Sequence, residues 1–350
     1  MSTHRNAGAQ VRRRRASARA SEPAARHERS GAPVTVDELD RALIQALWRD
    51  GRTSNRALAK ALGVSEATIA SRLARLEEAA ITRVVALVDM EAFGYEYLAF
   101  AKVRVGGRRL ADVAQDLTEL QESISVTITT GRFDLIVGLL ARDRAHLADL
   151  LGITVPAVRG VEDVACELGV EVLKYESRWS QLGGAPRPVE PVSASDRVDE
   201  LDLAIIGMLQ VDGRQSNRRI GAKLGVSEGA VRARIKRMQS EGLIRIQAVS
   251  DLSAFGIGAH AYVGVTVQGG RVRAVADALV KLDAAPVVIR SLGDFDLLLV
   301  LMAADREALV RTILDEIAVV PGVRRTETFE SCGTLKHSFT WARLVERAAG

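Results

Sequence analysis

Two stretches of the chain decide the fold: ALGVSEATIASRLARLEEAAIT at residues 61–82 and KLGVSEGAVRARIKRMQSEGLI at residues 223–244. They match at an offset of 162 residues and share the run Leu-Gly-Val-Ser-Glu. Gly63 follows an apolar helical pattern, and glycine ends a helix well because it adopts the left-handed conformation. Ser65 then offers its side-chain oxygen to the bare amides of the next helix. A short helix, a turn and a capped second helix are typical of a helix-turn-helix, whose second helix enters the DNA major groove.

The repeat extends over most of the chain at the same offset and without an insertion. Further matches are Leu39-Asp40 with Leu201-Asp202, Asp50-Gly51-Arg52 with Asp212-Gly213-Arg214, Phe93-Gly94 with Phe255-Gly256, Phe133-Asp134-Leu135 with Phe295-Asp296-Leu297, and Trp179 with Trp341. The two copies span roughly 37–180 and 199–345. Between them, SQLGGAPRPVEPVSAS (180–195) is rich in Pro, Gly and Ser, which is the composition of a linker.

The second part of each copy mixes strands and helices. YLAFAKVRV (97–105) alternates apolar and polar residues as a half-buried strand does, and ADVAQDLTEL (111–120) has helical spacing. SVTITTGRFDLIVGLLA (125–141) is predicted to form a strand, a glycine-containing turn and a second strand. A further helix at 143–151 and a strand at 164–172 complete the split βαβ pattern, which the second copy repeats.

We therefore predict an α+β fold, in which each copy is a winged-type helix-turn-helix followed by a ferredoxin-like (βαββαβ) α/β-sandwich. The predicted domains are a disordered Arg-rich tail (1–36), helix-turn-helix domains (37–90 and 199–252), ferredoxin-like domains (91–180 and 253–345) and a linker (181–198).

Composition and charge exclude several classes. No apolar run approaches the length of ~18 residues that a membrane helix needs, and no apolar stretch follows the basic N-terminus as in a secretory signal. We therefore expect a cytoplasmic protein, with Cys166 and Cys332 as reduced thiols. Residues 1–33 hold eight Arg and two Glu, so the net charge of +4 comes from the tail, and the rest of the chain is slightly acidic.

The buried stripe of each second helix indicates which side chains face outward. Ile69, Leu73 and Leu76 form this stripe in the first copy, and the equivalent residues of the second copy are also apolar. The predicted DNA-contact residues are Thr68, Ser71, Arg72 and Arg75 in the first copy, Arg232, Arg234, Lys236 and Arg237 in the second, and Ser54, Asn55, Ser216 and Asn217 at the starts of the preceding helices. Residues 65–76 carry a net charge of +1 and residues 227–238 carry +3, so we hypothesise that the second copy binds DNA more tightly.

These residues resemble the Lrp/AsnC (leucine-responsive, feast/famine) family of transcriptional regulators, as a tandem fusion of two copies. The shared pattern is LDxxxIxxLxxDGRxSNRxxxxxLGVSExxxxxRxxRxxxxxxI, followed by AFG, GxFDL and GV, and it covers almost all of 37–345. The resemblance implies a bacterial, nucleoid-located DNA-binding regulator without a cofactor. It also implies RAM/ACT-like sheet domains that pair with another copy and often bind an amino acid effector at that interface.

The family's effector pocket lies near the turn between the middle strands. By this resemblance the candidate effector-binding residues are Gly131, Arg132, Asp134, Gly293, Asp294 and Asp296. Glycine lets backbone amides approach a ligand carboxylate, and Asp294 would receive an ammonium group. Arg132 departs from the acidic residue of the second copy and would instead attract a carboxylate. Two alternatives stay open: the turns bind no ligand, and Asp134 and Asp296 bond only the turn backbone.

The sequence leaves further alternatives open. The two sheet domains would pair within one chain or in a larger homo-oligomer. A nucleoid-associated protein of low DNA specificity and an amino acid sensor are rival functions. Siroheme decarboxylases also resemble fused Lrp/AsnC pairs, but they carry histidine on the middle strands, where this chain has none. The five histidines are His4, His27, His146, His260 and His337, which show no metal or catalytic spacing.

Overall fold

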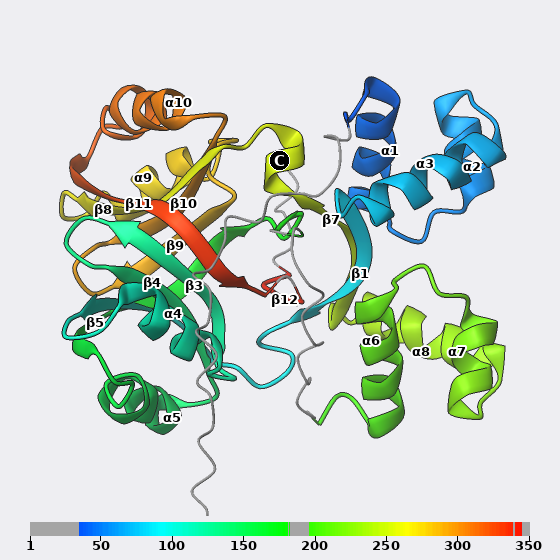
Figure 1. Ribbon diagram of the computed structural model, residues 1–350, viewed down its shortest axis with the longest axis horizontal. Helices are drawn as coiled ribbons and strands as arrows, with labels where there is room; N and C mark the ends of the chain where they lie inside the picture. Colours follow the sequence, from blue (N-terminus) through cyan, green and yellow to red (C-terminus); the bar gives the residue numbers. More distant parts are fainter. Residues whose placement is uncertain (1–34, 181, 183–195, 339, 345–350) are drawn as a thin grey trace, which may run out of the picture.

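The computed structural model describes residues 35–180, 182, 196–338 and 340–344. The predicted tail at 1–36 and linker at 181–198 therefore lie almost wholly outside the described residues. A barrel of strands occupies one side of the molecule, two helical heads occupy the other, and a small sheet connects them (Figure 1). In the described part of the chain, no helix is long and apolar enough to cross a membrane.

Each head is a bundle of three helices. Head 1 consists of α1 (Glu38–Arg49), α2 (Asn55–Leu62) and α3 (Glu66–Glu78), and head 2 of α6 (Glu200–Val211), α7 (Asn217–Leu224) and α8 (Glu228–Ser240). The predicted capping is confirmed, because Ser65 accepts a hydrogen bond from the Thr68 amide and Gly63 ends α2 with a φ of 68°. Ser227 and Gly225 do the same in head 2.

A ribbon of two strands joins the heads to the barrel. β1 (Thr82–Asp89) follows head 1, β7 (Ile244–Asp251) follows head 2, and the two pair in antiparallel fashion. The short strand β6 (Trp179–Ser180) of the first copy pairs with β7, and β12 (Trp341–Ala342) of the second copy pairs with β1. The strand that would form a wing after each head therefore pairs with the other copy.

The remaining elements form two ferredoxin-like units. The first comprises β2 (Tyr97–Val105), α4 (Leu110–Thr118), β3 (Ser123–Thr130), β4 (Leu135–Ala141), α5 (Arg144–Asp149) with a π-helical extension η1 (Leu150–Thr154), and β5 (Val161–Tyr175). The second, which follows the 3₁₀-helix η2 (Leu252–Phe255), comprises β8 (Ala259–Val267), α9 (Val272–Leu279), β9 (Val287–Leu292), β10 (Leu297–Ala303), α10 (Arg306–Arg311) with η3 (Thr312–Ile317), and β11 (Val323–His337). The predicted α+β class and element order are confirmed.

The two units close on each other into one barrel. Strand β5 pairs with β9, and β11 pairs with β3, so the strand order is β10-β8-β11-β3-β4-β2-β5-β9. The long strands β5 and β11 make this possible, because one end of each pairs within its own unit and the other end pairs with the opposite unit. The copies thus pair within a single chain.

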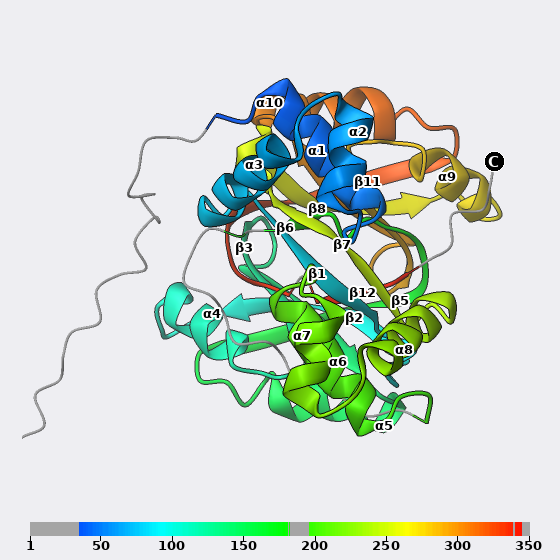
Figure 2. The same cartoon turned by 90° about the vertical axis from the view of Figure 1, so that its right-hand side faces the viewer.

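The copies are also crossed at the heads, which face the viewer in Figure 2 with the ribbon running between them. Helix α1 of head 1 packs on β7 of the second copy, and α6 packs on β1. The Gly51 amide donates to the Ile246 carbonyl at 3.0 Å, and the Gly213 amide donates to the Val84 carbonyl at 2.8 Å. A Cβ at position 51 would lie 2.6 Å from Cγ1 of Val84, so only glycine lets this turn approach the ribbon.

Candidate DNA-binding surface and effector turn

The second helices of the heads, α3 and α8, expose different side chains. Ser71 is exposed on α3, whereas Thr68 is half-buried and its hydroxyl lies 2.8 Å from that of Ser65. On α8, Arg232 and Lys236 are exposed, and Arg232 pairs with Glu228 at 2.7 Å. Serine and the two cations are therefore available at these surfaces for contacts with phosphates or bases.

The other four predicted arginines join the second helix of each head to the start of the first helix in the same head. Arg72 and Arg75 of α3 both bind the carboxylate of Asp40, which is fully buried at the start of α1, and Arg72 also binds Asp37. The hydrogen bond from Arg72 lowers the pKa of Asp37. In head 2 the equivalent residues Arg234 and Arg237 bind Asp199 and Asp202 in the same way.

These contacts explain why aspartates and arginines recur at the same spacing in both copies. Asp37 and Asp40 form a capping box at the start of α1, and Asp199 and Asp202 form one at α6. The arginines lock α3 and α8 against these helix starts. Sequence reasoning missed these partners, although the repeated Asp-x-x-Asp before each first helix was a visible signal.

The difference in charge between the heads resides at two positions. At the offset of 162 residues, Arg232 corresponds to Ala70 and Lys236 to Ala74, while the paired arginines are the same in both heads. All four of these residues are exposed. The charge asymmetry noted in the sequence is therefore a difference in solvent-facing cations.

The starts of α2 and α7 have intramolecular partners. Ser54 and Ser216 are helix N-caps whose hydroxyl oxygens accept from backbone amides. Asn55 and Asn217 accept hydrogen bonds from arginines of the opposite head, as described next. The exposed cations on these two helices, which sequence reasoning missed, are Arg56, Lys60, Arg218, Arg219 and Lys223.

Two reciprocal arginine contacts connect the heads. Arg52 of head 1 donates to Oδ1 of Asn217 at 2.9 Å, and Arg214 of head 2 donates to Oδ1 of Asn55 at 2.7 Å. Arg214 also donates to the carbonyls of Gly51 and Thr53. Burial lowers the pKa of both guanidinium groups. These contacts fix one head against the other.

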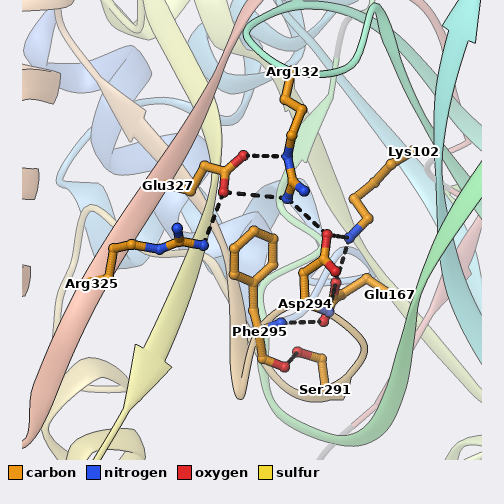
Figure 3. Close-up of polar contacts among 8 residues, drawn as sticks. All are labelled: Lys102, Arg132, Glu167, Ser291, Asp294, Phe295, Arg325 and Glu327. Atoms are coloured by element: carbon orange, nitrogen blue, oxygen red, sulfur yellow. Dashed lines mark hydrogen bonds and ion pairs between the residues drawn. The ribbon is translucent and has the colours of Figure 1, made fainter.

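Side chains of the two predicted effector turns meet in one cluster of polar contacts (Figure 3). Arg132 of the first turn binds Asp294 of the second at 2.8 Å, although they occupy equivalent positions in the two copies. Arg132 also binds Glu327 of β11 at 3.0 Å. Asp294 receives a second cation, Lys102 of β2, at 2.9 Å, and this hydrogen bond is the main reason that the pKa of Asp294 is lowered.

Glu167 completes the site from β5. Its carboxylate accepts from the amides of Asp294 at 3.1 Å and Phe295 at 3.0 Å, and it binds Lys102 at 2.8 Å. Glu167 is 0% exposed and Lys102 is 2% exposed. The chain's own carboxylate and ammonium therefore occupy the turn amides and the Asp294 oxygen that were predicted to bind an amino acid.

The remaining predicted effector residues shape the turns. Oδ2 of Asp134 accepts from the Val105 amide at 2.9 Å, and Oδ2 of Asp296 accepts from the Val267 amide at 2.7 Å. Gly131 has a φ of 126°, where glycine is favoured. A Cβ on Gly293 would lie 2.6 Å from the Cys166 carbonyl oxygen. Each aspartate thus bonds the backbone at the end of a neighbouring strand, β2 or β8, and not the backbone of its own turn, while Gly293 allows the second turn to approach β5.

No metal site is evident within the described ranges, where no group of three or more His, Cys, Asp and Glu side chains is gathered. His146 lies at the surface near Glu122, whereas His260 and His337 line an internal cavity. Burial raises the pKa of Cys166 to about 11, so this thiol is protonated at neutral pH.

Comparisons with known proteins agree with this architecture. The family model of the AsnC-type helix-turn-helix domain matches residues 36–77 and 198–239, and that of the Lrp/AsnC ligand binding domain matches 98–179 and 260–341. The chain is 35% identical over 152 residues to the HTH-type transcriptional regulator FL11 of Pyrococcus abyssi. The aligned region covers 43% of this chain and 97% of FL11. The matched length is about that of one of the two copies.

Two solved structures are also similar. The siroheme decarboxylase NirDL has a TM-score of 0.62 at 14% identity, over 86% of this chain and 93% of that one. AsnC of E. coli has a TM-score of 0.37 at 21% identity, over 39% of this chain and 93% of its own. The likeness to NirDL shows a shared fold of the tandem arrangement.

The paired arginines should matter for folding. Arg237→Ala should lower the free energy of unfolding by about 1.5–3 kcal/mol, because it removes a charged hydrogen bond to the buried Asp202. Lys236→Ala, its exposed neighbour on α8, should change it by less than about 0.5 kcal/mol. Urea unfolding followed by circular dichroism measures both, and equal values would contradict the structural role of Arg237.

Substitution of the two cations that bind Asp294 should lower the free energy of unfolding by different amounts. Lys102→Met should cost roughly 3–5 kcal/mol, because it leaves Glu167 charged and buried without its cation. Arg132→Met should cost about 0–1 kcal/mol, because its side chain is 42% exposed. The pKa of Asp294 is lower in the folded protein than in the unfolded chain, so its ion pairs stabilise the fold above the unfolded pKa. This stabilisation is lost as pH falls through the folded pKa. The difference in unfolding free energy between Arg132→Met and the wild type should therefore vanish in acid. A larger loss for Arg132→Met would contradict this assignment.

Proposed function

Since the chain belongs to the Lrp/AsnC family of HTH-type transcriptional regulators, we propose that one chain binds a specific duplex DNA site with both of its heads. The supporting observation is the pair of reciprocal contacts by Arg52 and Arg214, which fix the heads to each other together with the β1–β7 ribbon. A fixed pair of heads reads two half-sites at one separation. Because the two heads differ in sequence, the proposed operator has two unlike halves.

The proposed contacts differ between the heads. On α8, Arg232 and Lys236 bind DNA directly, whereas α3 presents Ser71 between small side chains. The cations at the starts of the preceding helices, Arg56, Arg218 and Arg219 among them, lie on the same heads and suit the phosphate backbone. The arginines bound to aspartates, among them Arg75 and Arg237, act as positioning residues for the two recognition helices.

An amino acid effector at the Gly293–Asp294 turn is a finer part of the proposal. Such a ligand would need the turn amides and the Asp294 carboxylate, and it would have to displace Glu167 and Lys102 from them. The binding free energy of a ligand is reduced by the free energy of opening a site that the chain itself fills. We therefore propose that free amino acids bind here weakly, if Glu167 is in place.

We further infer that the chain is not an enzyme. The relative at 35% identity is named a transcriptional regulator, and the likeness to NirDL at 14% identity concerns the fold. The cavity that contains His260 and His337 measures about 80 Å³, far below the several hundred Å³ of typical cofactor-sized pockets. A haem-like absorbance band in the purified protein would contradict this inference.

A nucleoid-associated protein of low DNA specificity would bind operator and competitor DNA equally, whereas a specific regulator would prefer the operator.

The charge difference between the heads gives a direct test of DNA binding. Arg232→Ala and Lys236→Ala should each reduce the slope of log affinity against log salt by about 0.9, because each removes one phosphate contact. The matched substitutions Ala70→Arg and Ala74→Lys in head 1 should raise the slope by about the same amount. Fluorescence anisotropy with a labelled fragment of the region upstream of the gene measures these slopes. Unchanged slopes in all four variants would overturn the proposed DNA surface.

The effector turn is tested by removing its internal ligand. Glu167→Gln should increase the affinity for free L-amino acids, because the neutral amide holds the turn amides less strongly than the carboxylate does. Thermal melting with each amino acid added singly measures the change. Glu327→Gln is the matched control, since Glu327 binds Arg132 and makes no contact with the turn amides. Equal amino acid binding by Glu167→Gln and the wild type would contradict the proposed competition.

A further inference from the structure

A second candidate ligand site lies inside the barrel. A cavity of about 80 Å³ lies between the strands of the first unit and those of the second. Trp179 of β6 and Trp341 of β12 line it at the end nearest the ribbon. Phe100 of β2 lines this cavity, whereas Lys102, two residues along the same strand, binds Asp294 of the effector turn. The two sites are therefore separated by about 7 Å along β2.

The cavity has one polar wall and one apolar wall. Thr127, His260, Tyr262 and Thr334 form the polar wall, and the apolar wall is made by Leu98, Phe100, Val287, Val300 and Met302. Within the polar wall, Nε2 of His260 lies 3.2 Å from the Thr334 hydroxyl, which lies 3.3 Å from that of Thr127. The Tyr262 hydroxyl lies 3.5 Å from that of Thr127. These hydroxyls form a short chain of exchangeable donors and acceptors along the wall.

The polar wall is a difference between the two copies. At the repeat offset of 162 residues, the counterparts of Thr127, His260, Tyr262 and Thr334 are Ile289, Leu98, Phe100 and Val172. The opposite side of the same barrel therefore places apolar residues at every one of these positions. Packing of the barrel does not require polar groups there, because apolar side chains fill the equivalent space in the other copy. A polar strip beside a cavity is instead the arrangement of a ligand site, in which a few polar groups orient an apolar molecule.

We propose that this cavity binds a small uncharged molecule that has one apolar ring and one hydroxyl or carbonyl group, of the class of simple phenols. The apolar wall would contact the ring, and Thr334, His260 and Tyr262 would exchange hydrogen bonds with the polar group. A cavity of this volume takes a molecule no larger than about one aromatic ring. Burial lowers the pKa of His260, which favours the neutral imidazole. The Glu176 carboxylate also lines the cavity but is paired with Lys174 and Arg178, so the lining offers a charged ligand no unpaired charge.

Occupancy would reach the DNA-binding side of the molecule. Trp179 pairs with Ser250 of β7, and Trp341 pairs with Val88 of β1, so both tryptophans belong to the sheet that carries the heads. A ligand in contact with them would report its presence in tryptophan fluorescence. None of the residues of the proposed effector turns lines the cavity, so the two ligand proposals are tested separately.

Binding is tested on the full chain with phenol as the probe and toluene as the apolar analogue of similar size. Phenol should quench tryptophan fluorescence saturably and raise the melting temperature, whereas L-leucine, which is charged, should not compete with it. His260→Leu and Thr334→Val, which introduce the residues of the counterpart positions 98 and 172, should each weaken phenol binding at least tenfold and leave toluene binding unchanged. Val300→Phe, which would fill the cavity, should abolish the binding of both.

Three outcomes would overturn the proposal. The first is the absence of a saturable response of the wild type to phenol. The second is phenol affinity that is the same in His260→Leu, Thr334→Val and the wild type. The third is toluene binding at an affinity equal to that of phenol, which would indicate an apolar cavity without a functional polar wall. The phenol and toluene measurements on the wild type test the proposal even if a variant fails to fold.

Discussion

The structure depends on how the open edges of two four-stranded sheets are satisfied. Each ferredoxin-like unit has the strand order of a sheet with two free edges, β3 and β5 in the first and β9 and β11 in the second. A free edge exposes unpaired backbone donors and acceptors, and it invites pairing with other chains. Here each edge is paired with an edge of the other copy, which closes the barrel. Closure places the inner faces of both sheets around one apolar core, and it brings the two effector turns together at one end and the heads together at the other.

Within this frame, the symmetric contacts are those that hold the architecture. The aspartate–arginine sets at the starts of α1 and α6, the glycine turns at 51 and 213, and the arginines at 52 and 214 are the same in both copies. Positions that face solvent on the recognition helices, such as Ala70 and Arg232, or that lie at the effector turns or the cavity are among those that differ. The copies therefore share these folding contacts and differ at surfaces where ligands would bind.

Much of the fold could be predicted from local patterns, because the caps, the glycine turns and the strand alternation are encoded within a few residues. Ser65 and Gly63 gave the boundaries of the helix-turn-helix in this way. The partners of Arg72 could not be read from a helical wheel, since Asp37 lies 35 residues away at the N-cap of another helix. The set formed by Lys102, Glu167 and Asp294 was equally hidden, because its members come from three strands or turns of both copies and meet only after the barrel has closed.

The same set explains what a fused pair can do that a symmetric pair cannot. Lys102 Nζ lies 5.5 Å from the ring centre of Phe133 and 5.0 Å from that of Phe295, two residues at equivalent positions, so it lies close to the approximate twofold axis. Its counterpart is Gly264, and a Cβ there would lie 2.4 Å from the Phe295 ring. In a dimer of identical chains the lysine would appear twice at the axis, and the two ammonium groups would repel each other in a buried place. One lysine and one glycine are possible only where the halves are encoded separately, and this lets the chain fill one effector turn with its own charges.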